Sequence, residues 1–384
     1  MAKLLEPFAA ATHSPPSLCS SPSSTITRRN LVSGVGAQPT RNSRQSQRVV
    51  SCTLVAGTSQ DNSAELMNLG RTPLRISKLG IGTLQWGDPG SGYGERFGEE
   101  QLASAFNVLI DGGINFFDTA EVYGYQGIKS GSSSEQLLGR FLKRPAVQGG
   151  DDQLSPVIAS KFFTIPWTNF LVGGGFRLTR KSLLEALKES LKRLDKKQID
   201  LYQIHFPFPI FTNAALMESL KEAVEEGLTK AVGVSNYSKF QMEEADDILS
   251  KYGIPLASNQ VQFSLLYQKP SEDGLLKSAQ ERGITVIAYS PLATGLLTAK
   301  TFDKIDSKSN QVRPLLDLMQ SVGANHGGKS VSQVALNYLI TKGALPIAGV
   351  KTVDQAKAHV ETLGWRLTDN EVEALEEKKR ALKL

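Results

Sequence analysis

Cysteine and histidine, the residues that build disulfides and many metal centres, are scarce in this sequence. The 384-residue chain has two cysteines, Cys19 and Cys52, and both precede residue 55. The part that folds therefore contains neither a disulfide framework nor a thiolate metal site. The histidines lack the close spacing of metal ligands and number only four: His13, His205, His326 and His359. We accordingly expect no metal centre.

Long hydrophobic runs are also missing. No window approaches the ~18 uninterrupted apolar residues of a membrane-spanning helix, so we expect no transmembrane segment. Hydrophobic residues make up 40% of the chain and charged residues 21%. This is the composition of a globular protein with enough apolar material for one large core or two smaller ones.

Acidic residues are almost absent from the first 55 residues, which hold six Lys and Arg side chains against Glu6 alone. This segment supplies the whole formal net charge of +5, and the remainder of the chain is neutral. A basic surface is the electrostatic signature of nucleic-acid binding. Because the folded part lacks such an excess, we expect no nucleic-acid partner.

The same segment is rich in Ser, Thr, Pro and Arg and shows neither helical nor strand periodicity. Such a composition is typical of an organelle transit peptide, and the Ser-rich, weakly apolar start favours a plastid over a mitochondrion. We predict that residues 1–55 are a disordered chloroplast transit peptide. The alternative is a disordered tail without a targeting function.

From residue 66 onward, short apolar runs alternate with amphipathic segments. Strands are predicted at 76–82, 114–118, 157–161, 200–205, 230–234, 257–261, 284–289 and 344–349. Helices are predicted at 99–111, 134–143, 180–194, 214–226, 238–251, 272–282, 330–341 and 353–361. This alternation predicts an α/β fold, a (β/α)8 TIM barrel formed as a single domain by residues 66–384. A doubly wound open sheet is the alternative, but the Gly-x-Gly-x-x-Gly fingerprint of its dinucleotide-binding form does not follow the first strand.

Three of the predicted strands end in a titratable side chain. These are Asp118, Lys161 and His205, and the phenol of Tyr123 lies five residues beyond the first. Burying a charged group at a strand end costs several kcal/mol unless the group is paired. Because the active site of a (β/α)8 barrel gathers at the carboxyl ends of the strands, we expect these four residues to form one catalytic site.

The four side chains suit the protonation of an oxygen atom. A tyrosine phenol, with an ordinary pKa of about 10, is a proton donor at neutral pH but a poor base. We expect the Lys161 ammonium, held by Asp118, to lower the pKa of Tyr123 towards the working range. A neutral His205 imidazole can orient a carbonyl group by a hydrogen bond. The set contains no nucleophile and no metal, so a cofactor must supply a hydride.

The segments that carry these residues resemble the tetrad motifs of the aldo-keto reductase family. They read Phe-Phe-Asp-Thr-Ala-Glu-Val-Tyr-Gly at 116–124, Ala-Ser-Lys-Phe at 159–162 and Leu-Tyr-Gln-Ile-His at 201–205. Further matches follow in family order at 233–237, 258–262, 288–292 and 347–351. The resemblance covers residues 66 to about 380, and it is nearest to the plant plastidic group of pyridoxal reductase-like and plastoglobule-associated members.

The resemblance implies that Tyr123 is the general acid, that Lys161 and Asp118 tune it, and that His205 positions the carbonyl. It also implies that NADP(H) is the cofactor. The nicotinamide end would be held by Ser235, Asn236, Gln260 and the ring of Tyr289, the pyrophosphate by Ser290, Leu292 and Gly295, and the adenosine end by Gly349, Lys351, Thr352 and Gln355. The charge of Lys351 favours NADP over NAD, because a cation there would meet the 2′-phosphate.

Two features depart from the family pattern. His359 stands four residues after Gln355, where relatives usually have Asn or Glu, which puts the adenine contact at that position in question. The segment 299–313 is short and lacks the Gly-Pro-Arg stretch that helps to cover the pyrophosphate in relatives. We therefore expect faster cofactor exchange or weaker cofactor binding than in those relatives.

Aromatic residues follow the strands that carry Lys161 and His205. Phe162, Trp167 and Phe206, with the Gly- and Ser-rich loop 124–134, are expected either to shape a substrate pocket or to pack the rim of the barrel. The sequence does not distinguish between these two interpretations.

We therefore predict a chloroplast NADPH-dependent oxidoreductase that reduces an aldehyde or ketone to an alcohol, with Tyr123 as the proton donor. Its partner would be a small-molecule carbonyl compound. Its location would be the stroma or the surface of thylakoids or plastoglobules, which leaves peripheral association with plastid membranes or lipid droplets open. The alternative is an NADP(H)-binding redox-sensing or scaffold subunit with little turnover.

Overall fold

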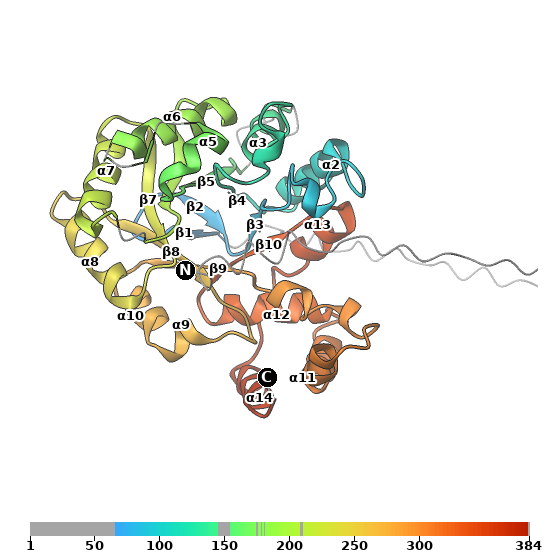
Figure 1. Ribbon diagram of the computed structural model, residues 1–384. Coiled ribbons are helices and arrows are strands. Elements are labelled where there is room, and N and C mark those ends of the chain that lie inside the picture. The colour runs from blue at the N-terminus through green and yellow to red at the C-terminus, as the bar shows by residue number, and fades with distance from the viewer. Residues whose placement is uncertain are drawn as a thin grey trace, which may run out of the picture. The chain divides into compact units, whose positions relative to one another are not determined.

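A computed structural model describes residues 66–144, 154–173, 176–177, 179, 181–207 and 210–382. The predicted transit peptide, residues 1–55, lies outside these residues. Eight strands close into a barrel in the order β10-β3-β4-β5-β6-β7-β8-β9. Helices surround this barrel (Figure 1). The predicted (β/α)8 TIM barrel is therefore confirmed.

All eight barrel strands pair in parallel with their neighbours, and β10 closes the barrel against β3. The strands are β3 (Gly80–Gly82), β4 (Phe116–Asp118), β5 (Val157–Phe162), β6 (Ile199–Ile204), β7 (Thr229–Ser235), β8 (Leu256–Gln262), β9 (Thr285–Tyr289) and β10 (Leu345–Gly349). In such a barrel all carboxyl ends lie at one mouth. The residues predicted to end the strands are thereby brought to the same side.

The first predicted strand, 76–82, is in fact two strands. Its beginning belongs to β2 (Arg75–Ser77), which pairs antiparallel with β1 (Leu66–Asn68), and only its end forms β3. Leu69 and Ile76 of this hairpin pack against the residues that fill the barrel. The Gly70 amide donates to Thr285 Oγ1 at the start of β9, at 2.8 Å. The hairpin therefore closes the amino-terminal end of the barrel and leaves the carboxyl mouth to the polar residues.

The predicted helices all occur, within a few residues at their ends. They are α2 (Glu99–Asp111), α3 (Ser134–Phe141), α6 (Lys181–Leu194), α7 (Asn213–Glu225), α8 (Lys239–Ser250), α10 (Leu275–Glu281), α12 (Val331–Thr341) and α13 (Val353–Val360). The structure adds the short helices α5 (Asn169–Val172) and α9 (Lys269–Glu272). It also adds two long ones, α11 (Ser307–Asn325) and α14 (Asp369–Arg380).

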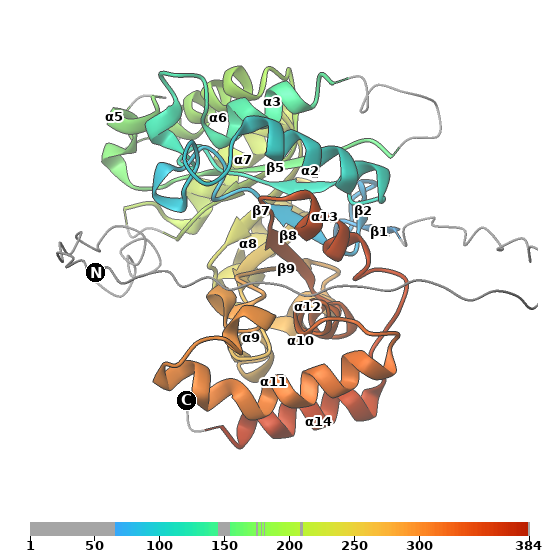
Figure 2. The ribbon, with the colours of Figure 1, turned by 90° about the vertical axis from the view of Figure 1, so that its right-hand side faces the viewer.

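Helices α11 and α14 lie side by side (Figure 2), and the sequence analysis missed both. Pro314 lies inside α11 and interrupts the pattern that normally identifies a helix. For α14 a signal was present, because Thr368 and Glu371 form a capping box at its start. The two helices are joined by His326 Nε2 and the Glu371 carboxylate at 2.9 Å. The segment 299–313, which the sequence analysis described as short, therefore contains the first turns of α11.

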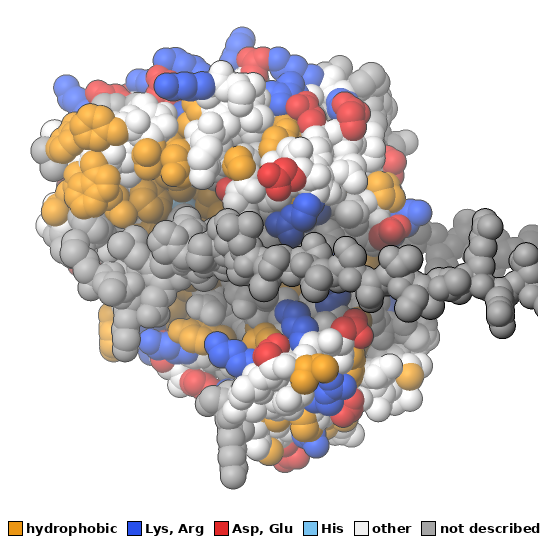
Figure 3. All heavy atoms as spheres, turned by 45° about the vertical axis from the view of Figure 1, so that its right-hand side comes forward, with side chains coloured by type: hydrophobic (Ala, Val, Ile, Leu, Met, Phe, Trp, Pro, Cys, Tyr) orange, Lys and Arg blue, Asp and Glu red, His pale blue; other side chains and the backbone are white. Residues whose placement is uncertain are grey.

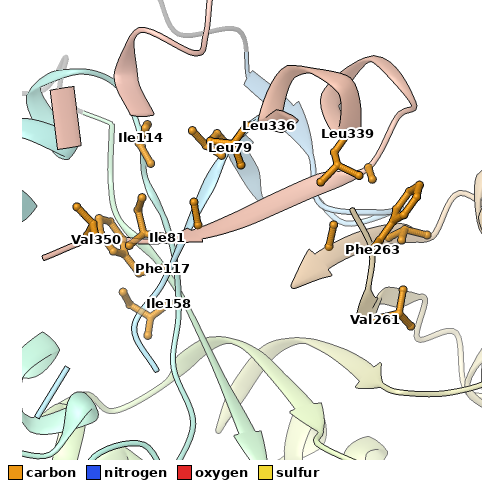
Figure 4. Close-up of a cluster of buried hydrophobic side chains, with 14 of the residues drawn as sticks. Leu79, Ile81, Ile114, Phe117, Ile158, Val261, Phe263, Leu336, Leu339 and Val350 are labelled. Atoms are coloured by element: carbon orange, nitrogen blue, oxygen red, sulfur yellow. The ribbon is translucent and has the colours of Figure 1, made fainter. Parts of the chain in front are cut away.

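Alternate residues of each strand enter two separate cores. Outward residues such as Phe117 and Ile158 belong to a cluster with Leu336 of α12 (Figure 4). Inward residues such as Phe116 and Val157 fill the barrel itself. Burying one such side chain stabilises the fold by about 1.5–3 kcal/mol. Because successive side chains on a strand point to opposite faces, residue parity decides which core each side chain enters.

On the face shown in Figure 3, Lys and Arg lie among Asp and Glu instead of gathering by sign. None of the helices in the described part of the chain is long and apolar enough to cross a bilayer. The same residues contain no group of three His, Cys, Asp or Glu side chains able to hold a metal ion.

Candidate active site

Strand parity places Asp118 and Lys161 inside the mouth of the barrel. Asp118 ends β4 two residues after the inward-facing Phe116, and Lys161 lies two residues after the inward-facing Ala159 of β5. The two strands are hydrogen-bonded neighbours. The Asp118 and Lys161 side chains are 2% and 0% exposed. A buried carboxylate and a buried ammonium are thus brought to the same point, where each compensates the charge of the other.

The Lys161 ammonium connects three of the four predicted catalytic residues. Its Nζ donates to Asp118 Oδ2 at 2.6 Å, to the Thr119 carbonyl at 2.8 Å and to the Tyr123 hydroxyl at 3.3 Å. The three protons of the ammonium therefore have three acceptors. The amine is fixed beside the phenol, which lies on the loop that follows β4.

The pKa of Tyr123 is raised well above 10, so the expectation that Lys161 would lower it is wrong for this structure. Burial is the larger cause, because the phenolate would lose its hydration, and the negative charge of Asp118 adds to the effect. Asp118 offsets the field of the ammonium at the phenol, and burial then decides the direction. Tyr123 consequently keeps its proton at neutral pH and is a hydrogen-bond and proton donor.

His205 follows β6 directly and completes the group of four. Its ring centroid lies 6.0 Å from that of Tyr123. Burial and, to a smaller extent, the charge of Lys161 lower the pKa of His205 well below 6.5, so the imidazole is neutral, as expected. Its Nδ1 is buried and has no hydrogen-bond partner among the described residues. Such an orphaned polar atom marks a place where a ligand can bind.

Phe163, the residue directly after β5, faces this group, whereas Phe162 at the end of β5 does not. Parity turns Phe162 outward into the core beneath the helices, so of the two interpretations left open for it, packing applies and a place at the pocket does not. The Phe163 ring meets His205 edge-on at 5.1 Å, and Phe206 stacks on His205 at 4.7 Å with a 12° interplanar angle. Trp167 is 55% exposed on the connection between β5 and α6. Two aromatic rings, those of Phe163 and Phe206, therefore border the imidazole.

Gln260 reaches the same centre because β8 contains an irregularity. The register between β7 and β8 shifts next to Val232, so that the consecutive residues Ala257 and Ser258 both face the interior of the barrel. One extra residue reverses the parity of the strand beyond it. Gln260 then points inward, and its Nε2 donates to Asp118 Oδ1 at 2.7 Å. Regular alternation from Ala257 would have turned this side chain away.

Gln203 is a member of the site that the sequence analysis did not predict. It is fully buried, and its Nε2 lies 3.4 Å from Asp118 Oδ1 while its Oε1 accepts from Ser258 Oγ at 3.2 Å. Its position two residues before His205 was an available signal, because parity puts both on one face. Asp118 therefore has an ammonium on one oxygen and two amides on the other.

Ser235, Asn236 and Tyr289 form a connected row beside His205. Asn236 Nδ2 donates to the His205 carbonyl at 3.0 Å, and the Tyr289 hydroxyl donates to Asn236 Oδ1 at 3.0 Å. Ser235 Oγ donates to the Gln260 carbonyl at 2.9 Å. Asn236 has a φ of 61°, which turns the chain sharply at the end of β7. The structure thus brings together all four residues predicted at the nicotinamide.

The chain turns again immediately after β9. Ser290, Ala293 and Thr294 have φ values of 52°, 48° and 54°. Turns with such left-handed residues orient backbone N–H groups into concavities that bind anions. A Cβ added at Gly295 would meet nothing within 4 Å, so the turn is open there. Ser290, Leu292 and Gly295, predicted at the pyrophosphate, all lie on this turn.

The residues predicted at the adenosine end lie together where β10 meets α13. Thr352 Oγ1 accepts from the Gln355 amide at 3.3 Å and caps α13, while Gln355 Oε1 accepts from the Lys351 amide at 2.7 Å. Gly349 ends β10, and its carbonyl lies 3.1 Å from His359 Nε2. His359 is buried and bound to the backbone. It thus joins α13 to the end of β10.

This row of residues fits a pyridine dinucleotide in its chemistry. Near the unpartnered His205 Nδ1 it offers amides and hydroxyls, which suit a carboxamide, and the Tyr289 ring, on which an aromatic ring can stack. At the other end it offers an open turn and the Lys351 ammonium, which suit phosphates. NAD(P)H would lie along these residues, with its nicotinamide end at Tyr289 and its adenosine end at Lys351.

A fully buried ion pair supports the loop that carries Tyr123. Glu121 accepts from Arg177 Nη2 at 2.6 Å and from the Phe163 amide at 2.6 Å, and both charged side chains are 0% exposed. Burial raises the pKa of Glu121, and the Arg177 charge opposes that shift. The pair ties the Tyr123 loop to the residue that contacts His205. Sequence analysis missed it because its partners lie 56 residues apart.

Comparison with known proteins agrees with this geometry. The family model described as the aldo/keto reductase family matches residues 78–380. A chloroplastic pyridoxal reductase of Arabidopsis thaliana is 36% identical over 318 residues, which cover 79% of this chain and 83% of that protein. An L-glyceraldehyde 3-phosphate reductase of Escherichia coli is 28% identical over 77% of this chain and 86% of its own.

Comparison with solved structures also finds an aldo-keto reductase. A crystal structure of a thermostable aldo-keto reductase in complex with the inhibitor epalrestat superimposes with a TM-score of 0.65 and 28% sequence identity. The match covers 82% of this chain and 99% of that one. The chain therefore belongs to the aldo/keto reductase family. It is an oxidoreductase, and the family's cofactors are NAD(P)H.

Proposed function

We propose that the protein reduces the carbonyl group of a small aldehyde or ketone to an alcohol, with NADPH as the reductant and Tyr123 as the proton donor. The observation that carries the proposal is the arrangement around Lys161. A protonated phenol lies 3.3 Å from a buried ammonium and next to a neutral imidazole. Two uncharged donors at one point suit a carbonyl oxygen on which negative charge develops.

Each of the four residues has a separate task in this reaction. When it is bound, the nicotinamide supplies the hydride that the carbonyl carbon accepts. The Tyr123 hydroxyl and the His205 imidazole orient the carbonyl oxygen, and the phenol proton passes to that oxygen. Lys161 then stabilises the phenolate that is left. Asp118 keeps the Lys161 amine charged, since burial alone favours its neutral form.

The other end of the site supports NADP as the preferred cofactor. Ser235, Asn236 and Gln260 would hold the carboxamide, and the ring of Tyr289 would stack on the nicotinamide. Ser290, Leu292 and Gly295 would line the pyrophosphate. Gly349, Thr352 and Gln355 would border the adenosine. The Lys351 ammonium supplies the charge that a 2′-phosphate requires and that NAD would leave unused.

The test is a turnover assay of the purified protein with NADPH and a panel of aldehydes, quinones and pyridoxal. Pyridoxal is included because a relative is named a pyridoxal reductase. We expect Tyr123→Phe to lower kcat by about 10²–10⁴-fold, the usual contribution of general acid catalysis. Its NADPH affinity should change by less than about threefold, because the phenol does not carry the cofactor's binding energy.

A matched control is Tyr252→Phe, because Tyr252 is an exposed tyrosine of the connection that follows α8. It should leave kcat unchanged. Full activity of Tyr123→Phe would remove Tyr123 from the role of proton donor. Binding of NADPH without turnover of any carbonyl compound would instead support the redox-sensing or scaffold alternative.

A chloroplast location is part of the same proposal. It is supported by the composition of residues 1–55 and by the chloroplastic relative. A fluorescent fusion of the full chain should enter plastids, and a fusion that lacks residues 1–55 should not. The stroma and the surface of thylakoids or plastoglobules would be separated by fractionating those plastids.

A further inference from the structure

The segment Asp88–Phe97, here named the β3–α2 loop, holds a fixed shape at the adenosine end of the site. Asp88 accepts from the Gly90 amide at 3.1 Å and from Ser91 Oγ at 2.5 Å, and the Gly94 amide donates to the Phe97 carbonyl at 2.8 Å. Phe97 is buried. The loop is therefore anchored to the barrel and presents the same atoms to any ligand that binds beside it.

Two cationic side chains share one oxygen of this loop. The Ser91 carbonyl accepts from Arg96 Nη2 at 3.0 Å and from Lys351 Nζ at 3.3 Å. The Lys351 ammonium also lies 5.0 Å from the centre of the Phe97 ring. Lys351 lies two residues after the end of β10, so the loop brings Arg96 next to a residue 255 positions away in the sequence. The guanidinium and the ammonium lie side by side.

The positive charge gathered here has no ion-pair partner among the described residues. In the described part of the chain, neither Arg96 nor Lys351 has a carboxylate at ion-pair distance, and each donates instead to the neutral Ser91 carbonyl. Burial lowers the pKa of Lys351, Arg96 and Lys300 lower it further, and only Asp88 acts in the opposite direction. Like charges held together without a counter-ion favour the binding of an anion.

The backbone beneath Arg96 is shaped to keep its guanidinium in this place. Gly92 has a φ of 93°, and a Cβ added to it would lie 2.2 Å from Arg96 Nε. The guanidinium thus rests directly on a residue that has no side chain. A guanidinium presents a planar fork of donors, whereas an ammonium is a point charge. Together the two groups can surround a phosphate monoester that carries close to two negative charges.

We propose that Arg96 is a second cationic contact for the 2′-phosphate of NADP, beside Lys351, and that the β3–α2 loop thereby determines the preference for NADPH over NADH. The inference rests on the proposed function, since it concerns the same cofactor. It adds a residue from a loop at the opposite end of the chain from the predicted adenosine residues. The loop that follows β10 then supplies only part of the phosphate site.

The test measures the Kd of the full chain for NADPH, NADH and adenosine 2′,5′-bisphosphate by calorimetry. We expect Arg96→Gln to raise the Kd for NADPH and for the bisphosphate by about five- to tenfold, the loss of one charged contact that is partly exposed. The Kd for NADH should change by less than about twofold. Arg96→Lys should recover part of the loss, because it restores the charge without the fork.

Arg75→Gln is the matched control, since Arg75 is an exposed arginine of the hairpin at the other end of the barrel. The double variant Arg96→Gln, Lys351→Met adds a second measurement. If both residues bind one phosphate, the double variant should bind NADPH no better than NADH, and the two single effects should not be additive.

Three outcomes are informative. Selective loss of NADPH and bisphosphate affinity supports the inference. An unchanged Kd, or equal losses for NADPH and NADH, overturns it and leaves the proposed function intact, because the wild-type protein still binds NADPH. A wild-type protein that binds NADPH no better than NADH contradicts the preference for NADP itself, and the inference falls with it.

Discussion

The two ends of the candidate site hold their charges in opposite ways. At the carbonyl end, the Lys161 ammonium and the Asp118 carboxylate are buried and compensate each other at 2.6 Å. At the adenosine end, Arg96 and Lys351 are drawn together on one neutral carbonyl oxygen with no carboxylate at ion-pair distance among the described residues. At one end the charges neutralise each other within the protein, and at the other an excess positive charge is left that a ligand can neutralise.

Because of this difference, substitutions at the two ends should have different effects. A buried charge that loses its partner is costly, so a change at the carbonyl end should affect folding and turnover together. A half-exposed cation contributes little to folding. A change at the adenosine end should therefore affect cofactor affinity and leave the free energy of unfolding nearly constant.

The largest effect is expected at Lys161. Lys161→Met leaves Asp118 buried with only amide partners, and we expect a loss of about 3–5 kcal/mol in the free energy of unfolding together with a loss of kcat of about 10³-fold. Urea unfolding and steady-state kinetics measure the two effects. Adding Asp118→Asn should restore part of the stability but none of the turnover. A stable and active Lys161→Met protein would remove the contrast between the two ends.

The buried pair beneath the Tyr123 loop should give the next largest effect. Arg177→Met leaves Glu121 buried without its cationic partner, which we expect to cost about 3 kcal/mol of stability. The double variant with Glu121→Gln should recover most of it. If the pair also positions Phe163 against His205, kcat should remain lowered in the double variant while the Kd for NADPH is unchanged. Recovery of kcat along with stability would assign the pair a structural role alone.

The buried histidines should make stability depend on pH. Burial holds the pKa of His205 well below 6.5 and also lowers the pKa of His359 from 6.5. Below pH ~6.5 the unfolded chain therefore binds protons at these histidines that the folded protein does not bind. Stability is complete above pH ~6.5 and falls below it, for His205 by up to about 1.4 kcal/mol one pH unit lower. Unfolding at pH 7.5 and pH 5.5 measures this, and His359→Gln should flatten the difference. An equal slope in that variant would contradict the contribution of His359.

The smallest effect concerns salt at the adenosine end. Raising the ionic strength from about 0.05 to about 0.5 M shortens the range over which exposed charges act. We expect the Kd for NADPH to rise by about two- to fivefold, whereas the Kd for NADH and the kcat at saturating cofactor should hardly change. A kcat that falls in parallel with affinity would show that the carbonyl end is not shielded as its burial implies.

Much of the fold could be read from the chain because its signals are local. Strand runs and amphipathic helices of a (β/α)8 barrel follow one another in sequence, and neighbouring strands pair in order. The errors lie where a local signal was weak or misleading. The run 76–82 continues through a turn and was read as one strand, and Pro314 obscured α11. The extent of the folded part as a single domain stays a prediction.

The meeting of the candidate site residues could be predicted where strand ends alone decide it. Asp118, Lys161 and His205 follow short apolar runs, so their meeting at one mouth follows from the barrel. Gln203 was missed although its parity with His205 was an available signal, and Glu121 and Arg177 were missed because the two partners lie 56 residues apart.

What the sequence by itself determined is the order of strands and helices and the identity of the polar groups that end three of those strands, because both depend on residues close together in the chain. Tertiary structure alone decided that an irregular β8 turns Gln260 onto Asp118, that Phe163 and not Phe162 meets His205, and that Arg96 lies beside Lys351 on Ser91. The physical reason is that these contacts join distant segments. Their geometry depends on how the barrel packs as a whole, which no local pattern encodes.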